Sequence, residues 1–244
     1  MQLIISGVEI EVRKKVIKNM HLQVKPPEGH VVISAPKTMD DKAIEIYART
    51  NLSWIKKQIE KYQNQNRSTR RQYVSGETIF LWGKQYYLSF VPSENRNSFE
   101  IVGDKIILSM RKESTVKQRE NYVREQYRIR LKEELESLVP KWEKITGLHC
   151  AEWQTKYMLT KWGYCNVEKK KLWFNLQLAQ KPIECLEYVV LHELIHLKER
   201  RHNSVFLSYM DLYMKNWRDI RKELNDSRLD YYVPQNSANS KMTL

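Results

Sequence analysis

The sequence predicts an α+β protein with a β-rich N-terminal region, followed by a region in which a hairpin precedes a helix that carries two histidines. Three observations lead to this prediction. Residues 1–112 hold short runs of alternating apolar and polar residues, separated by turn residues, as strands do. From residue 113 onward most apolar residues recur at helical spacing. The motif His192-Glu-Leu-Ile-His196 lies in one of these helical segments.

The length of 244 residues suits one large domain or two small ones, and 41% hydrophobic residues can form a substantial core. We expect a β-rich region with one helix at 1–112, a second domain at 113–230 that contains the histidine motif, and a tail at 231–244. No segment approaches the run of about 18 apolar residues that spans a bilayer. The opening residues are interrupted too early by Glu9 to form a secretory signal, so a soluble cytoplasmic protein is expected.

The formal net charge is +13, and residues 1–75 carry 14 Lys and Arg against 7 Asp and Glu. A basic excess can favour nucleic acid, an acidic partner or an anionic surface. No basic block is interleaved with aromatic residues suited to stacking on bases, so a solvated face is the simpler interpretation. The three cysteines lack the paired spacing of structural zinc or redox sites, and we interpret them as reduced and incidental.

The first region begins with alternating segments that predict a small antiparallel sheet and one helix. The expected strands are 8–12, 20–24 and 30–35, and the helix runs from Asp40 to a polar exit at 63–68, which is the best linker candidate. Further strands are expected at 78–82, 85–90, 98–102 and 105–109.

The second region begins with a long helix over 115–145, which we expect to be broken near Pro140 and ended by Gly147. Two strand-like runs, 153–165 and 171–178, predict a hairpin. A buried helix then starts at Pro182 and fades by Arg200. The last helix is expected to begin at Asn203 or Ser204 and to run to Leu224, packing behind the histidines.

The two histidines of the motif lie four residues apart, so a helix places both imidazoles on one face with Glu193 beside them. A catalytic zinc takes three protein ligands and leaves a fourth position open, and His202 follows at a workable distance. Glu199 is the competing third ligand, although its basic neighbours favour a solvated position. The spacing also matches the metzincin pattern, except that Glu199 replaces the glycine at which that motif turns. His21, His30 and His149 lack ligand spacing, and we interpret them as structural or exposed.

These residue types predict hydrolysis of an amide with one Zn²⁺ per chain. Zinc binds neutral imidazole nitrogens at about 2.0 to 2.1 Å and lowers the pKa of bound water to about 7. Glu193 would take the proton of that water and pass it to the leaving amine. The donor that stabilises the oxyanion is left open among Tyr209, Tyr213 and Lys156.

Four segments together resemble the YgjP-like metallopeptidases, a family related to the SprT-like and WLM groups of zincins. They are Lys161-Trp-Gly-Tyr-Cys-Asn166, Phe174-Asn-Leu176, Tyr188-Val-Val-Leu-His-Glu-Leu-Ile-His196 and His202-Asn-Ser-Val-Phe206. The resemblance implies a zincin-like catalytic domain with zinc held by His192, His196 and His202 and with Glu193 as base. Lys161 and Tyr164 depart from the arginine and serine of the family motif.

The predicted hairpin offers an edge to which an extended protein or peptide substrate can pair. Trp162, Phe174 and Asn175 are the residues we expect to contact that substrate. Two other functions stay open: a DNA-associated protease of the SprT or WLM kind, and a non-enzymatic protein that binds nucleic acid or a partner around a structural zinc. No membrane partner is expected, and the sequence leaves the oligomeric state open.

Overall fold

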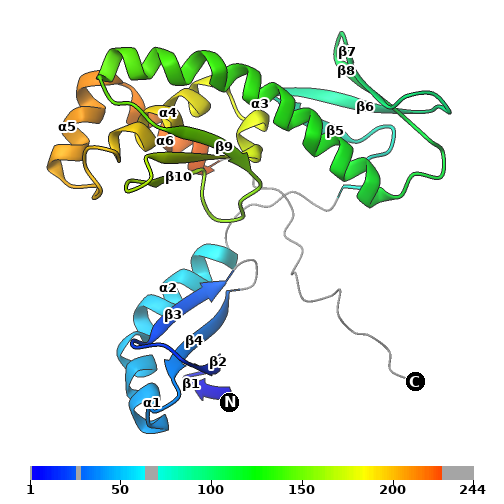
Figure 1. Ribbon diagram of the computed structural model, residues 1–244. Helices are drawn as coiled ribbons and strands as arrows, with labels where there is room; N and C mark the ends of the chain where they lie inside the picture. Colours follow the sequence, from blue (N-terminus) through cyan, green and yellow to red (C-terminus); the bar gives the residue numbers. More distant parts are fainter. Residues whose placement is uncertain (1, 26–28, 64–70, 227–244) are drawn as a thin grey trace. The chain divides into compact units, whose positions relative to one another are not determined.

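The computed structural model describes residues 2–25, 29–63 and 71–226, which form two compact units (Figure 1). The first unit holds the described residues up to 63, and the second holds those from 71 onward. Both combine sheets with helices, which confirms the predicted α+β class. The expected tail at 231–244 lies outside the described residues, as does most of the polar run at 63–68.

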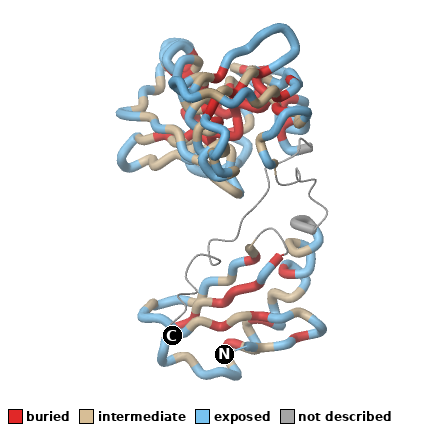
Figure 2. Tube along the Cα trace, turned by 90° about the vertical axis from the view of Figure 1, so that its right-hand side faces the viewer, coloured by how far each residue is buried: buried red, intermediate tan, exposed pale blue. Residues whose placement is uncertain are grey.

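The structure divides the chain at a different place from the boundary expected between residues 112 and 113. Ile79 and Ile106, from strands before that boundary, belong to the same buried cluster as Val123 and Leu131, from the helix after it. The strands from residue 78 onward therefore share their core with the helical segments. Figure 2 shows the buried residues of each unit in red.

The first unit is a four-stranded sheet covered by two helices. Its strand order is β1-β2-β4-β3, and β2 pairs with β4 in parallel while the other two pairs are antiparallel. The predicted all-antiparallel sheet was therefore wrong for one pair, because the β3–β4 hairpin places β4 beside β2 and leaves β3 at the edge. Its elements are β1 (Gln2–Ile5), β2 (Val8–Lys15), β3 (His21–Lys25), β4 (His30–Pro36), α1 (Asp41–Thr50) and α2 (Leu52–Gln63).

The single helix predicted after the sheet is two helices separated at Asn51. The Asn51 side chain donates to the carbonyl oxygen of Tyr47 at 2.8 Å and so satisfies the end of α1. Ile44 and Ile55, one from each helix, are fully buried against Ile10 and Ile33 of the sheet. The apolar spacing predicted this buried face but not the interruption.

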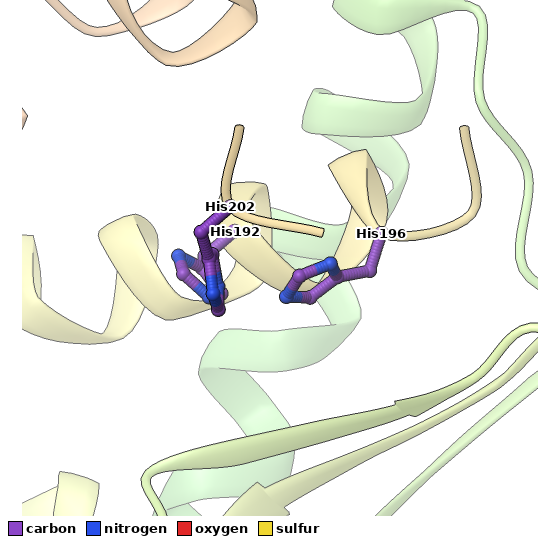
Figure 3. A group of neighbouring side chains, drawn as sticks. All are labelled: His192, His196 and His202. Carbon is purple, nitrogen blue, oxygen red and sulfur yellow. The ribbon is translucent and has the colours of Figure 1, made fainter. Parts of the chain in front are cut away.

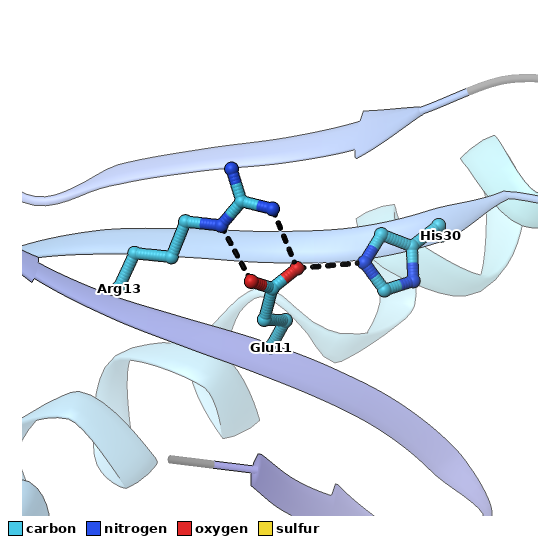
Figure 4. A network of polar contacts seen from close by, with 3 residues as sticks. All are labelled: Glu11, Arg13 and His30. Atoms are coloured by element: carbon cyan, nitrogen blue, oxygen red, sulfur yellow. Dashed lines mark hydrogen bonds and ion pairs between the residues drawn. The ribbon is translucent and has the colours of Figure 1, made fainter. Parts of the chain in front are cut away.

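The opposite face of this sheet carries polar side chains, among which Glu11 is held by two neighbours (Figure 4). The Arg13 guanidinium donates to both Glu11 oxygens, at 2.5 and 2.9 Å, and His30 Nε2 lies 2.9 Å from Oε2. These contacts hold the pKa of Glu11 at about 2, with the Arg13 hydrogen bond as the largest cause and the His30 contact next.

The second unit begins with a sheet that repeats the arrangement of the first. Its order is β5-β6-β8-β7, with β6 and β8 parallel and the other pairs antiparallel. Both first hairpins turn through two residues with positive φ, Ser6 and Gly7 in one and Trp82 and Gly83 in the other. The strands are β5 (Thr78–Leu81), β6 (Lys84–Pro92), β7 (Ser98–Val102) and β8 (Lys105–Met110).

The long helix α3 (Val116–Thr146) runs through the second unit without a break. Thr115 and Gln118 form a capping box at its start, and Gly147 ends it with φ 71°. The predicted break at Pro140 is not present. Proline removes one helical hydrogen bond, but buried residues next to it, Val139 and Trp142 among them, hold the helix in the core.

A three-stranded sheet, β10-β11-β9, follows α3. The hairpin of β10 (Gly163–Asn166) with β11 (Lys171–Asn175) is antiparallel, as predicted. The run expected as one strand over 153–165 is two, since β9 (Glu152–Lys156) pairs in parallel with the other side of β11. Asn175 ends β11 because its side chain accepts a hydrogen bond from the Gln177 amide, which starts the 3-10 helix η1 (Leu176–Gln180).

Three helices complete the unit: α4 (Ile183–Ile195), α5 (Ser204–Tyr213) and α6 (Trp217–Asp226). The helix predicted over 203–224 is therefore two helices, with Met214 ending the first. Asn203 is the predicted N-cap, and its side chain accepts from the Phe206 amide at 3.0 Å. The central helix α4 packs against α3, α5, α6 and the β10–β11 hairpin. None of the helices in the described part of the chain has the length and apolar character needed to cross a membrane.

The two units have separate cores, so a cavity in one core should destabilise that unit selectively. Ile33 and Leu131 are both fully buried, one in each cluster. Replacing either residue with Ala should lower the unfolding free energy of its own unit by about 2–5 kcal/mol. Hydrogen–deuterium exchange should show lost protection in residues 2–63 for Ile33→Ala and in residues 71–226 for Leu131→Ala. Equal loss in both units from either variant would show that they unfold as one.

The Glu11 contacts predict acid sensitivity of the first unit. The pKa of Glu11 is lowered from 4.5 to about 2 in the folded protein, so the stabilisation is complete above pH 4.5 and is lost as the pH falls toward 2. The hydrogen-exchange protection factors of residues 2–63, which are corrected for the intrinsic pH dependence of amide exchange, should fall over this range in the wild type. Glu11→Gln should remove part of that pH dependence, whereas Glu60→Gln, at an exposed position on α2, should retain it. An unchanged pH profile in Glu11→Gln would contradict the role of this contact.

Candidate metal centre

The helix α4 places two histidines and a glutamate at one end of a buried segment. Leu191, Leu194 and Ile195 are fully buried, so the apolar residues of α4 fix the helix in the core. His192 and His196 then lie one turn apart on a common face. The helix ends at Ile195, but His196 keeps helical backbone angles as its C-cap, so the predicted spacing is preserved.

His202 approaches the same point from the segment between α4 and α5. Its Nε2 atom lies 2.9 Å from His192 Nε2, and the three imidazoles offer ligand atoms within 4.8 Å of one another (Figure 3). Nitrogens bound to one zinc at about 2.0–2.1 Å in tetrahedral geometry lie roughly 3.3 Å apart. The separation of His192 and His202 is close to this value, and the three imidazoles form a group that could hold a single metal ion.

The outer nitrogens of the two helical histidines have hydrogen-bond partners of their own. His192 Nδ1 lies 3.3 Å from the Tyr188 hydroxyl, and His196 Nδ1 lies 3.0 Å from the carbonyl oxygen of Glu199. Such contacts select the ring orientation and leave Nε2 for a metal. The Glu199 carboxylate accepts instead from the Arg201 amide and is not part of the group around the centre.

Phe206 of α5 supports all three imidazoles. Its ring centroid lies 4.9 Å from that of His192 and 4.8 Å from those of His196 and His202, and the side chain is 1% exposed. Asn203 caps α5 by accepting a hydrogen bond from the Phe206 amide, and it directly follows His202 in the chain. The start of α5 thus lies behind the histidines, where the sequence predicts that this helix packs.

Burial keeps the three imidazoles neutral near pH 7. The pKa of His192 is lowered to about 3, mainly by burial and also by the charges of His196 and His202. Burial is also the main reason why the pKa values of His196 and His202 are lowered. Neutral rings present lone pairs, and this donor set therefore suits a borderline metal such as zinc.

Glu193 lies under strand β10 and is only 5% exposed. A Cβ added to Gly163 would stand 2.5 Å from Glu193 Oε1 and 2.7 Å from its Cγ, so only glycine leaves room for this carboxyl group. Burial raises the pKa of Glu193 to about 8, and the charge of Lys161 opposes that rise.

A cleft of about 680 Å³ opens over these residues. Trp162 lines it, as expected of a substrate contact, together with His192 and Glu193. Phe174 and Asn175 do not. Phe174 is fully buried, and the Asn175 side chain donates to the carbonyl oxygens of Met158 and Lys161, which lie in the loop before β10. Alternation in the sequence could not show which face of the hairpin turns toward the core.

The three residues considered for oxyanion stabilisation also lie outside the lining of this cleft. Tyr209 and Tyr213 stack on each other with centroids 6.4 Å apart, and Lys156 ends β9. The lining contains Tyr188 and Arg221 instead. Tyr188 could have been found from the sequence, because it precedes His192 by one helical turn, whereas Arg221 reaches the cleft only through the packing of α6.

Comparison with protein families gives one match over most of the chain. The model described as "YgjP-like, metallopeptidase domain" matches residues 18–227. The chain belongs to the YgjP-like family. This confirms the resemblance inferred from the sequence motifs, and membership makes the chain a metallopeptidase, with proteins or peptides as its substrate class.

Solved structures with similar parts include two metallopeptidase zymogens. Abylysin from Pyrococcus abyssi is 17% identical, with a TM-score of 0.35, and the match covers 37% of this chain and 90% of that one. Jannalysin from Methanocaldococcus jannaschii is 22% identical, with a TM-score of 0.32, covering 38% and 92%. No curated protein sequence matches the chain.

The close approach of Gly163 to Glu193 predicts a positioning effect. If Glu193 acts as the base expected from the sequence, Gly163→Ala should displace its carboxyl group and lower peptidase kcat by about 10- to 100-fold, because a shift near 1 Å at a reacting group has this effect. Metal content should stay unchanged, since the imidazoles are not touched. Gly103→Ala is the control: its added Cβ meets nothing within 4 Å, and the backbone strain of alanine at φ 62° falls in the turn between β7 and β8, which does not line the cleft. Full activity in Gly163→Ala would show that the position of Glu193 is not critical.

Proposed function

We propose that the protein is a zinc-dependent peptidase with one zinc per chain, held by His192, His196 and His202. The observation that carries the proposal is the convergence of three neutral imidazoles beside the buried carboxyl group of Glu193, in a cleft open to substrate. When bound, zinc supplies an electrophile for the scissile carbonyl and lowers the pKa of water to about 7.

Glu193 is proposed as the general base. It follows His192 directly, so it stands at the edge of the ligand set without belonging to it. Its carboxyl group takes a proton from the attacking water and gives that proton to the leaving amine nitrogen. A base must be ionised: burial opposes this, the Lys161 charge favours it, and a divalent cation at the imidazoles would favour it further.

Strand β10 is proposed as the edge that aligns the substrate. It is the outer strand in the order β10-β11-β9, and its residues from Gly163 to Asn166 line the cleft. Its free edge can pair with an extended peptide through backbone hydrogen bonds. We therefore propose β10 and Trp162 as the substrate contact in place of Phe174 and Asn175.

A structural zinc is the main alternative from outside the enzymes. Such a site is closed by four protein ligands. Among the described residues, the group of potential ligands at this centre has three members, which favours an open catalytic site. A DNA-associated peptidase stays a further alternative because the chain carries a net charge of +13; it requires salt-dependent DNA binding and cleavage stimulated by DNA.

The role of Glu193 can be tested by replacing only its charge. Zinc-loaded Glu193→Gln should keep about one zinc per chain, since the three imidazoles suffice to bind it. Its kcat for peptide hydrolysis should fall by about 10²- to 10⁴-fold because the general base is lost. Glu184→Gln, at an exposed position on the same helix, is the control and should retain activity.

Metal analysis and kinetics on the same samples separate the possible results. Unchanged turnover in Glu193→Gln would remove Glu193 from the mechanism. Loss of zinc from that variant would show instead that Glu193 is a ligand.

A further inference from the structure

Three basic side chains from separate segments line the cleft of the metal centre. Lys161 precedes β10, Arg200 follows α4, and Arg221 belongs to α6. The acidic residues of the lining are Glu168 and Glu193, and the second is the proposed base. Positive charge therefore gathers where a substrate must lie.

None of these three side chains has an ion pair or a side-chain hydrogen bond within the described ranges. Other basic residues of the second unit are paired, such as Arg218 with Asp211 and Lys171 with Glu152. Lys161 Nζ lies 5.0 Å from the centre of the Tyr164 ring, and the Arg221 guanidinium lies 5.9 Å from that of Trp217. Both cations thus contact aromatic rings, which leave their hydrogen-bond donors available.

The cations lie close to the metal centre itself. Lys161 and Arg221 line the same cleft as His192, Glu193 and His202. One comes from the loop before β10, and the other comes from α6.

Unpaired cations that meet in a cleft with low-dielectric walls attract an anionic group more strongly than the same cations spread over a surface. We propose that this cleft selects peptides that carry a carboxylate near the scissile bond, with Arg221 as the principal contact and Lys161 and Arg200 beside it. A guanidinium group suits this purpose because its N–H groups bind both oxygens of a carboxylate. The inference rests on the proposed peptidase function and names its substrate class.

The carboxylate has two possible sources, an Asp or Glu side chain and the C-terminus of the peptide. Matched fluorogenic peptides distinguish them: one set carries Glu or Gln at each position around the cleaved bond in turn, and each peptide is made with a free or an amidated C-terminus. The zinc-loaded wild type should cleave the best carboxylate peptide with a kcat/KM at least about tenfold above that of its neutral partner.

Arg221→Gln should reduce this preference toward unity, mainly by lowering kcat/KM for the carboxylate peptide. Lys222→Gln, at the next and exposed position on α6, does not line the cleft and should keep the preference. Zinc content measured for each variant shows that the metal centre is intact. A preference that persists undiminished in Arg221→Gln would overturn the assignment of Arg221.

The two proposals fail in different ways. If no peptide of either set is cleaved by the zinc-loaded protein, the proposed peptidase function is contradicted. If Glu and Gln peptides, and free and amidated ones, are all cleaved with equal kcat/KM, the peptidase function stands and the carboxylate preference is wrong. If kcat/KM differs only between Glu and Gln peptides, the recognised carboxylate is that of an internal acidic residue. If kcat/KM differs only between free and amidated peptides, it is the C-terminal carboxylate.

Discussion

The phenyl ring of Phe206 contacts all three imidazoles of the candidate metal centre, and the geometry of that centre depends on this contact. The ring is buried, so it cannot move without opening the core around α5. The same residue donates its backbone amide to Asn203, the cap that starts α5 directly after His202. A local capping interaction and a tertiary packing contact therefore act on adjacent residues, and together they bring His202 to the two helical histidines.

On the other side of the centre, the backbone of Gly163 lies close to the side chain of Glu193. Gly163 lets β10 pass against Glu193, and the hairpin that holds Gly163 is anchored by Asn175, whose side chain binds the loop before it. Burial then determines the electrostatics: it keeps the imidazoles neutral and works against the charge on Glu193. The three cations of the cleft are exposed to solvent and have no ion-pair partner in the described part of the chain, so their positive field acts on a substrate that enters the cleft.

Features with a local cause could be predicted from the sequence. The pairing of His192 with His196 follows from helical spacing, the Asn203 cap from its residue type, and the C-terminal end of α3 from Gly147. Phe174 and Asn175, expected at the substrate, do not line the cleft, because alternation marks a strand without telling which of its faces meets the core.

Features with a tertiary cause could not be predicted. Arg221 lines the cleft because the chain turns between α5 and α6. The apolar spacing continues across this turn, so the sequence predicted a single helix there. The parallel pairing of β2 with β4, and its repetition in β6 and β8, depends on strands that are distant in sequence. The expected boundary near residue 112 failed to separate compact units because sheet and helix share one core.

The central claim is that three histidines hold one zinc and leave a position open. X-ray absorption at the zinc edge of the metal-loaded protein tests it most directly, since it reports the number and type of ligand atoms. The account predicts three imidazole nitrogens and one further oxygen from solvent, at about 2.0–2.2 Å. A fourth ligand from the protein, such as a sulfur at about 2.3 Å, would contradict it. So would a spectrum of His202→Ala that still shows three imidazole ligands.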